Sequence, residues 1–269
     1  MSSIRHYIIN VVLICAMLVN TSPAMAESSY SLDLGEAHNG IFTLNYNIAD
    51  KKVKLMVQKN RTTIFYNLVN GTVSETFPLQ MGDGRYSIAV LENTAGDKYR
   101  IVFQEMIRLQ QKNRMSVYLQ SVQAIKWDQE SEAVKKAKEL TRDIQGDEQK
   151  IKTVYEYIIK NFSYEYEALG RLSHDYLPDI EKTFTSKKGI CYDFSSLFAS
   201  MLRSIGIPAK LAKGYTDRVE GYHAWNEVYL QDTDKWMLID TSFDAQMYSF
   251  NQAYSMYKDE NSYRKISEQ

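Results

Sequence analysis

The sequence predicts an α+β protein in which an N-terminal antiparallel β-sandwich precedes a region of mixed helices and strands. Two observations support this prediction: residues 27–121 alternate apolar and polar side chains, and residues after 122 include segments with helical spacing. The 269 residues are 44% hydrophobic and 24% charged, which is typical of a chain that buries a core. A formal net charge of -1 provides no attraction for polyanions, so nucleic acid is not an expected partner.

The first 26 residues have the pattern of a secretory signal. Arg5 lies in a short polar start, residues 8–19 are apolar apart from Asn10, and Ala24-Met25-Ala26 provides a small-residue cleavage site. The apolar run is shorter than the ~20 residues needed to span a membrane. We therefore expect cleavage before Glu27, export from a bacterial cell to the exterior or the cell surface, and no integral membrane segment in the mature chain.

Short alternating runs between residues 27 and 121 predict the sandwich. Turn-forming pairs such as Asn39-Gly40 and Asn70-Gly71 separate runs in which every second side chain is apolar. We expect about six to eight antiparallel strands. No catalytic grouping is found in this region, so a structural or adhesive role is favoured for it. The apolar faces are expected at Phe42, Leu44 and Tyr46, at Val53, Leu55 and Val57, at Tyr86, Ile88 and Val90, and at Tyr99, Ile101 and Phe103.

A change of composition predicts where the second domain begins. Glu, Lys and Ala become frequent between about residues 122 and 142, which favours helix, and residues 122–269 are expected to form this domain. Asp147 is placed to cap a further helix. The buried face of that helix follows the spacing of Ile151, Val154, Tyr155, Ile158 and Ile159. The tail after Asn251 is polar with weak helical character.

The strongest helical pattern in the chain begins at Cys191. Its apolar stripe consists of Phe194, Leu197, Phe198, Met201, Leu202 and Ile205, and Gly206 followed by Pro208 predicts its end. The first turn of a helix favours an anion, so a thiolate is stabilised there. After signal cleavage Cys191 is the only cysteine. Such a thiol is a small buried residue, a site of intermolecular pairing or a nucleophile.

A thiolate that attacks an acyl group needs an imidazole to hold and return a proton. His174 lies in a polar stretch without periodicity, where a surface position is the default. His223 begins a segment, 223–230, that alternates as a strand, and the next strand, 235–241, carries Asp240. A connection of four residues places Asp240 diagonal to His223 on the same face, where a carboxylate can fix the imidazole tautomer.

Together these residues resemble the transglutaminase-like superfamily of papain-related cysteine enzymes over about residues 147–244. The resemblance implies Cys191 as the nucleophile, His223 as general base and acid, and Asp240 as the residue that orients His223. It also implies an α+β domain in which the cysteine helix packs on an antiparallel sheet. Three blocks in family order carry it: GICYDFSSL running into LRSIGIPA at 189–197 and 202–209, then Gly214-Tyr215 with HAWNEV at 223–228, then WMLIDT at 236–241.

The sequence departs from the family pattern after Asp240. The family usually continues with Pro-Thr, whereas this chain continues with Thr241-Ser242. Family members often use an upstream aromatic residue to stabilise the oxyanion, and both Tyr164 and Tyr166 are candidates for that role. The backbone N–H of Cys191 is a further donor because it lies at the helix start.

The expected function is therefore acyl transfer through a thioester by an exported enzyme. The substrate is expected to be a protein or a cell-wall peptide, with peptidase or amidase action narrowly favoured over protein-glutamine transamidation. No cofactor is expected, and the spacing of cysteines and histidines predicts no zinc site. The alternative is a non-catalytic surface or adhesion protein that retains the fold as a scaffold.

Overall fold

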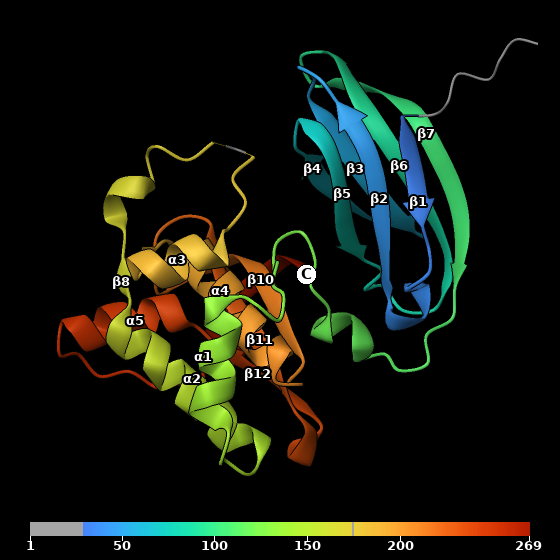
Figure 1. Cartoon of the computed structure of the whole chain (residues 1–269). Coiled ribbons are helices and arrows are strands. Elements are labelled where there is room, and N and C mark those ends of the chain that lie inside the picture. The colour runs from blue at the N-terminus through green and yellow to red at the C-terminus, as the bar shows by residue number, and fades with distance from the viewer. Residues whose placement is uncertain (1–28, 174) are drawn as a thin grey trace, which may run out of the picture.

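The computed structural model describes residues 29–173 and 175–269. The predicted secretory signal and His174 lie outside the described residues. Strands β1 to β7 form two antiparallel sheets, and helices α1 to α5 with a further antiparallel sheet follow them in the chain (Figure 1). None of the described helices is long and apolar enough to cross a membrane.

The N-terminal sheets confirm the predicted antiparallel β-sandwich. One sheet has the order β1-β2-β5 and the other the order β4-β3-β6-β7, and buried side chains such as Leu44, Leu55 and Tyr86 fill the space between them. The alternating apolar residues of β2 and β3 thus form one buried face on each strand, as the sequence predicted. The strands are β1 (Tyr30–Asp33), β2 (Ile41–Ile48), β3 (Val53–Lys59), β4 (Thr62–Leu68), β5 (Gly71–Pro78), β6 (Gly84–Ala95) and β7 (Lys98–Leu109).

The apolar face of β7 is the part of the sandwich where the alternation misleads. Ile101 was expected to be buried with Phe103, but its side chain is 53% exposed. The pairing with β6 shifts between Val90 and Leu91, so that Val90 pairs with Phe103 while Leu91 pairs with Ile101. A bulge of this kind inserts one residue into the alternation and reverses which side chains face the core.

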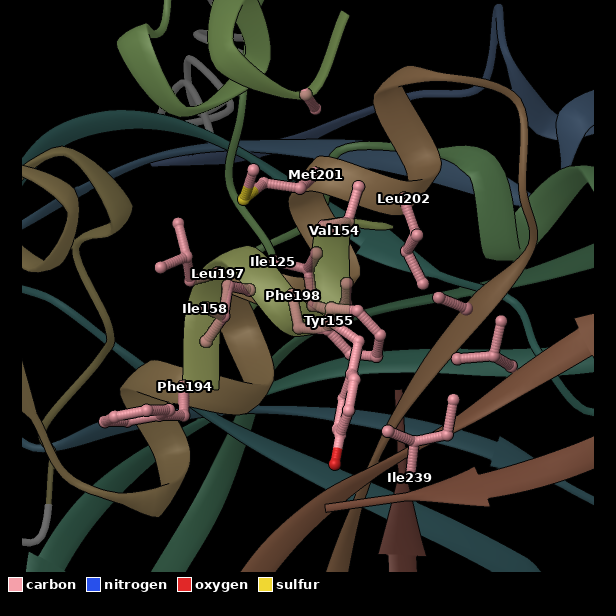
Figure 2. Packing of buried hydrophobic residues seen from close by; sticks show 14 of the residues in the cluster. Ile125, Val154, Tyr155, Ile158, Phe194, Leu197, Phe198, Met201, Leu202 and Ile239 are labelled. Atoms are coloured by element: carbon pink, nitrogen blue, oxygen red, sulfur yellow. The ribbon is translucent and has the colours of Figure 1, made fainter. Parts of the chain in front are cut away.

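The second region packs helices on one side of a four-stranded antiparallel sheet. The sheet has the order β12-β11-β10-β13, and α4 packs on β10 and β11. Figure 2 shows side chains from α2 and α4 converging in the core, among them Tyr155, Phe198 and Leu202. This arrangement confirms the fold class, including the helix that begins at Cys191. The elements are α1 (Glu132–Thr141), α2 (Asp147–Asn161), β8 (Ser163–Tyr164), α3 (Ile180–Ser186), β9 (Lys188–Gly189), α4 (Cys191–Ser204), β10 (Ala209–Thr216), β11 (His223–Leu230), β12 (Lys235–Ile239), α5 (Thr241–Ser249) and β13 (Tyr263–Glu268).

Two expectations for this region need correction. The helix expected between about residues 122 and 142 does form, but only over Glu132–Thr141, and before it the carbonyl of Ala124 accepts a hydrogen bond from Ser196 Oγ at 2.8 Å. The tail after Asn251 contains strand β13 rather than weak helix, and this strand pairs with β10. Pairing with a distant strand overrides the weak local preference of a polar segment.

Candidate active site

The cysteine helix α4 begins where the sequence predicted. Cys191 is its first residue and is 7% exposed, and the backbone N–H of Ile190 donates to Asp193 Oδ2 at 2.9 Å. Gly189 makes this turn possible, because a Cβ at that position would lie 2.6 Å from the Cβ of Asp193. The local packing therefore fixes the position of the thiol relative to the helix start.

Strand β8 brings one of the two candidate tyrosines to the thiol. β8 pairs in parallel with β9, with Tyr164 opposite Gly189, which brings Tyr164 close enough to Cys191 for the two side chains to interact electrostatically. Burial, together with the charge of Cys191, raises the pKa of Tyr164, so its hydroxyl keeps its proton at neutral pH. Tyr166 is 54% exposed, and its hydroxyl donates to Gln246 Oε1 at 2.5 Å. The structure therefore places Tyr164, and not Tyr166, beside Cys191.

His223 and Asp240 form the central contact of the site. β11 and β12 pair in the register expected from a four-residue connection, with Leu230 opposite Lys235. His223 Nε2 lies 2.7 Å from Asp240 Oδ2, and the side chains are 4% and 1% exposed. Strand β12 ends at Ile239, two residues before the end of the expected strand 235–241, because Asp240 caps the next helix. The diagonal placement inferred from the sequence thus becomes a direct hydrogen bond.

Asp240 also caps the helix that begins directly after it, where the chain departs from the family pattern. Its Oδ1 accepts hydrogen bonds from the backbone N–H of Phe243 and from Ser242 Oγ, both at 3.0 Å. Its Oδ2 accepts from the hydroxyl of Tyr263, also at 3.0 Å. These donors begin helix α5, which the sequence analysis did not predict, and they hold the carboxylate toward His223.

The electrostatics of this pair favour imidazolium and carboxylate. Burial alone would raise the pKa of Asp240. The charge of His223 and its hydrogen bond outweigh burial and hold the pKa of Asp240 below its usual range. Burial lowers the pKa of His223, but the charge and hydrogen bond of Asp240 outweigh this effect, and the nearby Cys191 side chain raises the pKa of His223 further. Since Nε2 contacts Asp240, Nδ1 is the ring nitrogen left to exchange a proton with the thiol.

Cys191 and His223 share a cavity of about 300 Å³. The remaining wall is aromatic, apolar or hydroxylated, except for one lysine, Lys213. The lining residues are Leu172, Ser173, Tyr176, Ile190, Cys191, Tyr192, Lys213, Tyr222, His223 and Ala224. In residues 29–173 and 175–269, no three His, Cys, Asp or Glu side chains are grouped so that they could hold a metal ion.

Sequence reasoning missed two residues of this site. Tyr263 comes from β13, and its contact with Asp240 spans a separation that no local pattern reveals. Lys213 did leave a signal: Ala209, Leu211 and Lys213 alternate along one face of β10, and the first two lie in the core under α4. Lysine is rarely fully buried, so Lys213 in line with two core residues indicates that this face of the strand leaves the core at that position.

Comparisons with known proteins agree with this reading of the second region. Residues 134–241 match the family model of the transglutaminase-like superfamily. The uncharacterized protein YebA of Bacillus subtilis (strain 168) is 33% identical over 112 residues, which is 35% of this chain. The match covers 15% of YebA, so the chain spans only a small part of the length of this relative.

Solved structures that resemble parts of this chain include two from bacteria and one from a fish. A Cytophaga hutchinsonii protein, provisionally assigned as a cysteine protease, is 14% identical with a TM-score of 0.46, and the match covers 86% of this chain and 76% of that one. LapG of Legionella pneumophila is 19% identical with a TM-score of 0.27, over 40% of this chain and 72% of that one. Red sea bream transglutaminase is 13% identical with a TM-score of 0.30, over 76% of this chain and 48% of that one.

The family match spans the helix of Cys191, the strand of His223 and the position of Asp240, which are the features from which the site was built. Residues 134–241 of this chain are therefore a transglutaminase-like domain.

Proposed function

We propose that the protein is a cysteine-dependent acyl-transfer enzyme. The observation that carries this proposal is the buried contact of 2.7 Å between His223 Nε2 and Asp240 Oδ2, beside a cavity that Cys191 also lines. A scaffold without catalysis has no use for a buried, oriented imidazole next to its thiol. The alternative, a non-catalytic surface or adhesion protein, does not explain why the protein buries the charged pair His223 and Asp240 despite the free-energy cost of removing it from water.

The geometry supports a two-step reaction. The thiolate of Cys191 attacks the carbonyl carbon of an amide, the C–S bond forms, and the C–N bond then breaks as the amine leaves with a proton from His223. The backbone N–H of Cys191 and the hydroxyl of Tyr164 are the proposed donors to the oxyanion. Water or a second amine then attacks the thioester, with His223 accepting its proton.

Hydrolysis is favoured over transamidation because, among the described residues, only one of the four aromatic side chains considered as walls of a water-excluding channel lines the Cys191 cavity. Four aromatic residues near the catalytic strands were considered as walls for such a channel: Tyr215, Tyr222, Trp225 and Trp236. Of these, Tyr222 lines the Cys191 cavity and is 54% exposed. Trp225 is fully buried in a separate cluster with Ala212, Leu238 and Tyr263. We therefore propose peptidase or amidase action, with transamidation second.

One assay separates the two reactions. A glutamine-bearing peptide is incubated with a labelled primary amine, and both labelled peptide and free acid are measured, with Cys191→Ala as the control. We expect free acid to form faster than labelled peptide, and neither product with the control. Faster incorporation of the amine would overturn the preference for hydrolysis.

The nucleophile assignment has its own test. Iodoacetamide should alkylate Cys191 well below pH 8, and His223→Ala should slow that reaction because the imidazolium no longer stabilises the thiolate. Alkylation that follows an ordinary thiol titration in both proteins would show that Cys191 is not an activated nucleophile.

We also propose that the enzyme acts outside the cell on a protein or a cell-wall peptide. The support is the signal pattern of residues 1–26. Cell fractionation tests this: the full chain should be found outside the cytoplasm, and a chain lacking residues 2–26 should remain inside. Equal distributions of the two chains would contradict the proposal.

A further inference from the structure

Lys213 occupies an unusual position on the strand beside His223. β10 and β11 pair with Lys213 opposite Ala224 and Gly214 opposite His223. The row of alternate residues that includes Ala209 and Leu211 packs under α4, and Lys213 is its next member. Helix α4, which covers Ala209 and Leu211, begins only at Cys191. Lys213 lies next to this helix end and lines the cavity together with the thiol.

Among the described residues, no carboxylate side chain pairs with Lys213. Its Nζ lies 3.4 Å from the centre of the Tyr192 ring, and none of the ion pairs among the described residues includes it. The described residues that line the cavity include no Asp or Glu. Burial lowers the pKa of Lys213 to about 8, partly offset by the Cys191 charge, so the ammonium is still mostly protonated at pH 7.

Lys210, on the same strand, is a partly buried lysine whose charge is compensated by carboxylates. Its Nζ lies 3.5 Å from Glu227 Oε2 and 3.4 Å from Glu268 Oε1. Two carboxylates thus compensate one partly buried ammonium on the outer face of the sheet. On the inner face the ammonium of Lys213 has the Tyr192 ring, the Cys191 side chain and the cavity around it, and no described carboxylate pairs with it.

We propose that Lys213 binds a carboxylate of the acyl-donor substrate, and that the enzyme prefers an acidic peptide whose carboxylate lies next to the attacked carbonyl. This proposal rests on the proposed acyl-transfer function and names its substrate class. The Tyr192 ring supports the ammonium, and a substrate carboxylate entering the cavity replaces lost hydration with a charge-assisted hydrogen bond. Lys213 is thereby a specificity residue and takes no part in proton transfer.

A pair of small alkylating reagents tests the site without requiring turnover. Iodoacetate and iodoacetamide have the same size and reactive carbon, but iodoacetate carries a carboxylate. The rate of modification of Cys191 by each is measured at pH 7 from the mass of its tryptic peptide, in the full chain, in Lys213→Met and in Lys188→Met. Lys188 is exposed and also precedes the helix start, so it serves as the matched control.

The expected result is a fall of about fivefold or more in the iodoacetate-to-iodoacetamide rate ratio for Lys213→Met. Lys188→Met should keep the ratio of the unchanged protein, and Lys213→Arg should retain most of it because the charge remains. An unchanged ratio in Lys213→Met would overturn the proposal. Equal slowing by both reagents would also overturn it, since Lys213 would then act on the thiolate and not on the incoming carboxylate.

Matched peptides extend the test to catalysis. Two acyl donors that differ only in Glu or Gln next to the attacked amide are compared by kcat/KM. The unchanged protein should prefer the Glu peptide by about fivefold or more, and Lys213→Met should lose that preference. If neither peptide is turned over, the proposed function fails while the alkylation ratio still decides whether Lys213 attracts a carboxylate. Equal kcat/KM for both peptides in the unchanged protein would overturn the substrate class.

Discussion

The hydroxyl of Tyr263 donates to Asp240 Oδ2 at 3.0 Å, the same oxygen that lies 2.7 Å from Nε2 of His223. Tyr263 begins the last strand of the sheet, so the end of the chain supports the central contact of the site. A buried carboxylate that keeps its charge needs several donors, and Tyr263 is one of four around Asp240. The Asp240 carboxylate is therefore held by residues from β11, α5 and β13 together.

Replacing Tyr263 with Phe should lower kcat by about two- to tenfold with little change in KM, because one neutral hydrogen bond contributes about 0.5–1.5 kcal/mol. The loss of a donor also raises the pKa of Asp240, which shifts the acid limb of the pH profile upward. Tyr248→Phe, an exposed tyrosine on α5, is the control. A Tyr263→Phe enzyme with an unchanged kcat and pH profile would show that the hydroxyl has no positioning role.

Gly214 is required by the close approach of β10 and β13. A Cβ at this position would lie 2.1 Å from the carbonyl oxygen of Arg264 and 3.0 Å from the Trp225 ring. Gly214→Ala should therefore lower the free energy of unfolding by about 1–3 kcal/mol, as measured by urea denaturation. At Gly170 no atom lies within 4 Å of an added Cβ, so Gly170→Ala should change the stability by less than about 0.5 kcal/mol. Similar losses in the two variants would contradict the packing argument.

The parts of the site that the sequence predicted correctly depend on local patterns. The helix at Cys191 has a continuous apolar stripe and a glycine that ends it, with φ of 84° at Gly206. The register that brings Asp240 to His223 follows from the length of one connection. Both signals are contained within about twenty residues, where helical spacing and turn length determine the geometry.

The parts that the sequence did not predict depend on contacts between distant segments. β13 is polar and mostly exposed, so its pairing with β10 leaves almost no trace in the pattern of hydrophobic residues. Tyr164 could not be distinguished from Tyr166 before β8 was seen to pair with β9, since that pairing alone decides which side chain reaches Cys191. The exposure of Ile101 follows from a bulge, which also has no local signature here.

A second buried aspartate, Asp244, should make stability depend on pH in an unusual direction. Its Oδ2 accepts a hydrogen bond from Tyr155 at 2.7 Å, and its Oδ1 lies 2.5 Å from Lys258 Nζ. Burial raises the pKa of Asp244 to about 6, although Lys258 and Tyr155 oppose this shift. The folded protein therefore holds this proton more tightly than the unfolded chain, whose aspartate has its ordinary pKa near 3.8.

Stability from this group is present below pH ~4 and is lost as the pH rises through about 6. The unfolding free energy of the unchanged protein, relative to that of Asp244→Asn, should fall by on the order of 3 kcal/mol between pH 4 and pH 7. Urea denaturation at several pH values measures this difference. The exposed Asp232→Asn serves as the control and should show no such trend. A difference that rises with pH would mean that the Lys258 pair, and not burial, dominates.

The last prediction concerns where the second domain begins. Arg203 is 2% exposed, and burial lowers its pKa to about 9. Its three hydrogen bonds go to backbone carbonyls, with Nη1 donating to Gln120 at 2.6 Å, Nε to Ala209 at 2.9 Å and Nη2 to Gln269 at 3.2 Å. The predicted boundary between residues 121 and 122 would remove the carbonyl of Gln120 from this buried charge.

Residues before that boundary also pack on the sheet of the second region. The ring of Tyr118 lies 5.1 Å from that of Trp236, and Lys210 Nζ lies 5.0 Å from the Tyr118 ring centre. We therefore propose that the folding unit starts near residue 116, where the short 3₁₀-helix Ser116–Leu119 begins. A fragment from 116 to 269 should retain both sets of contacts, whereas a fragment from 122 to 269 should lose them.

The free energy of unfolding of the shorter fragment should be lower by about 2–4 kcal/mol, because a buried charge loses a hydrogen bond and an aromatic contact is removed as well. Urea denaturation of the two fragments measures the difference, and a fragment from 110 to 269 provides the control, since its added residues precede these contacts. The fragment from 116 should also retain rapid alkylation of Cys191, because each side chain assigned to the site follows residue 163. If the fragments from 116 and 122 are equally stable, the boundary lies at residue 121 as the sequence predicted. If the fragment from 116 is unfolded, the β-sandwich and the second region fold as one unit.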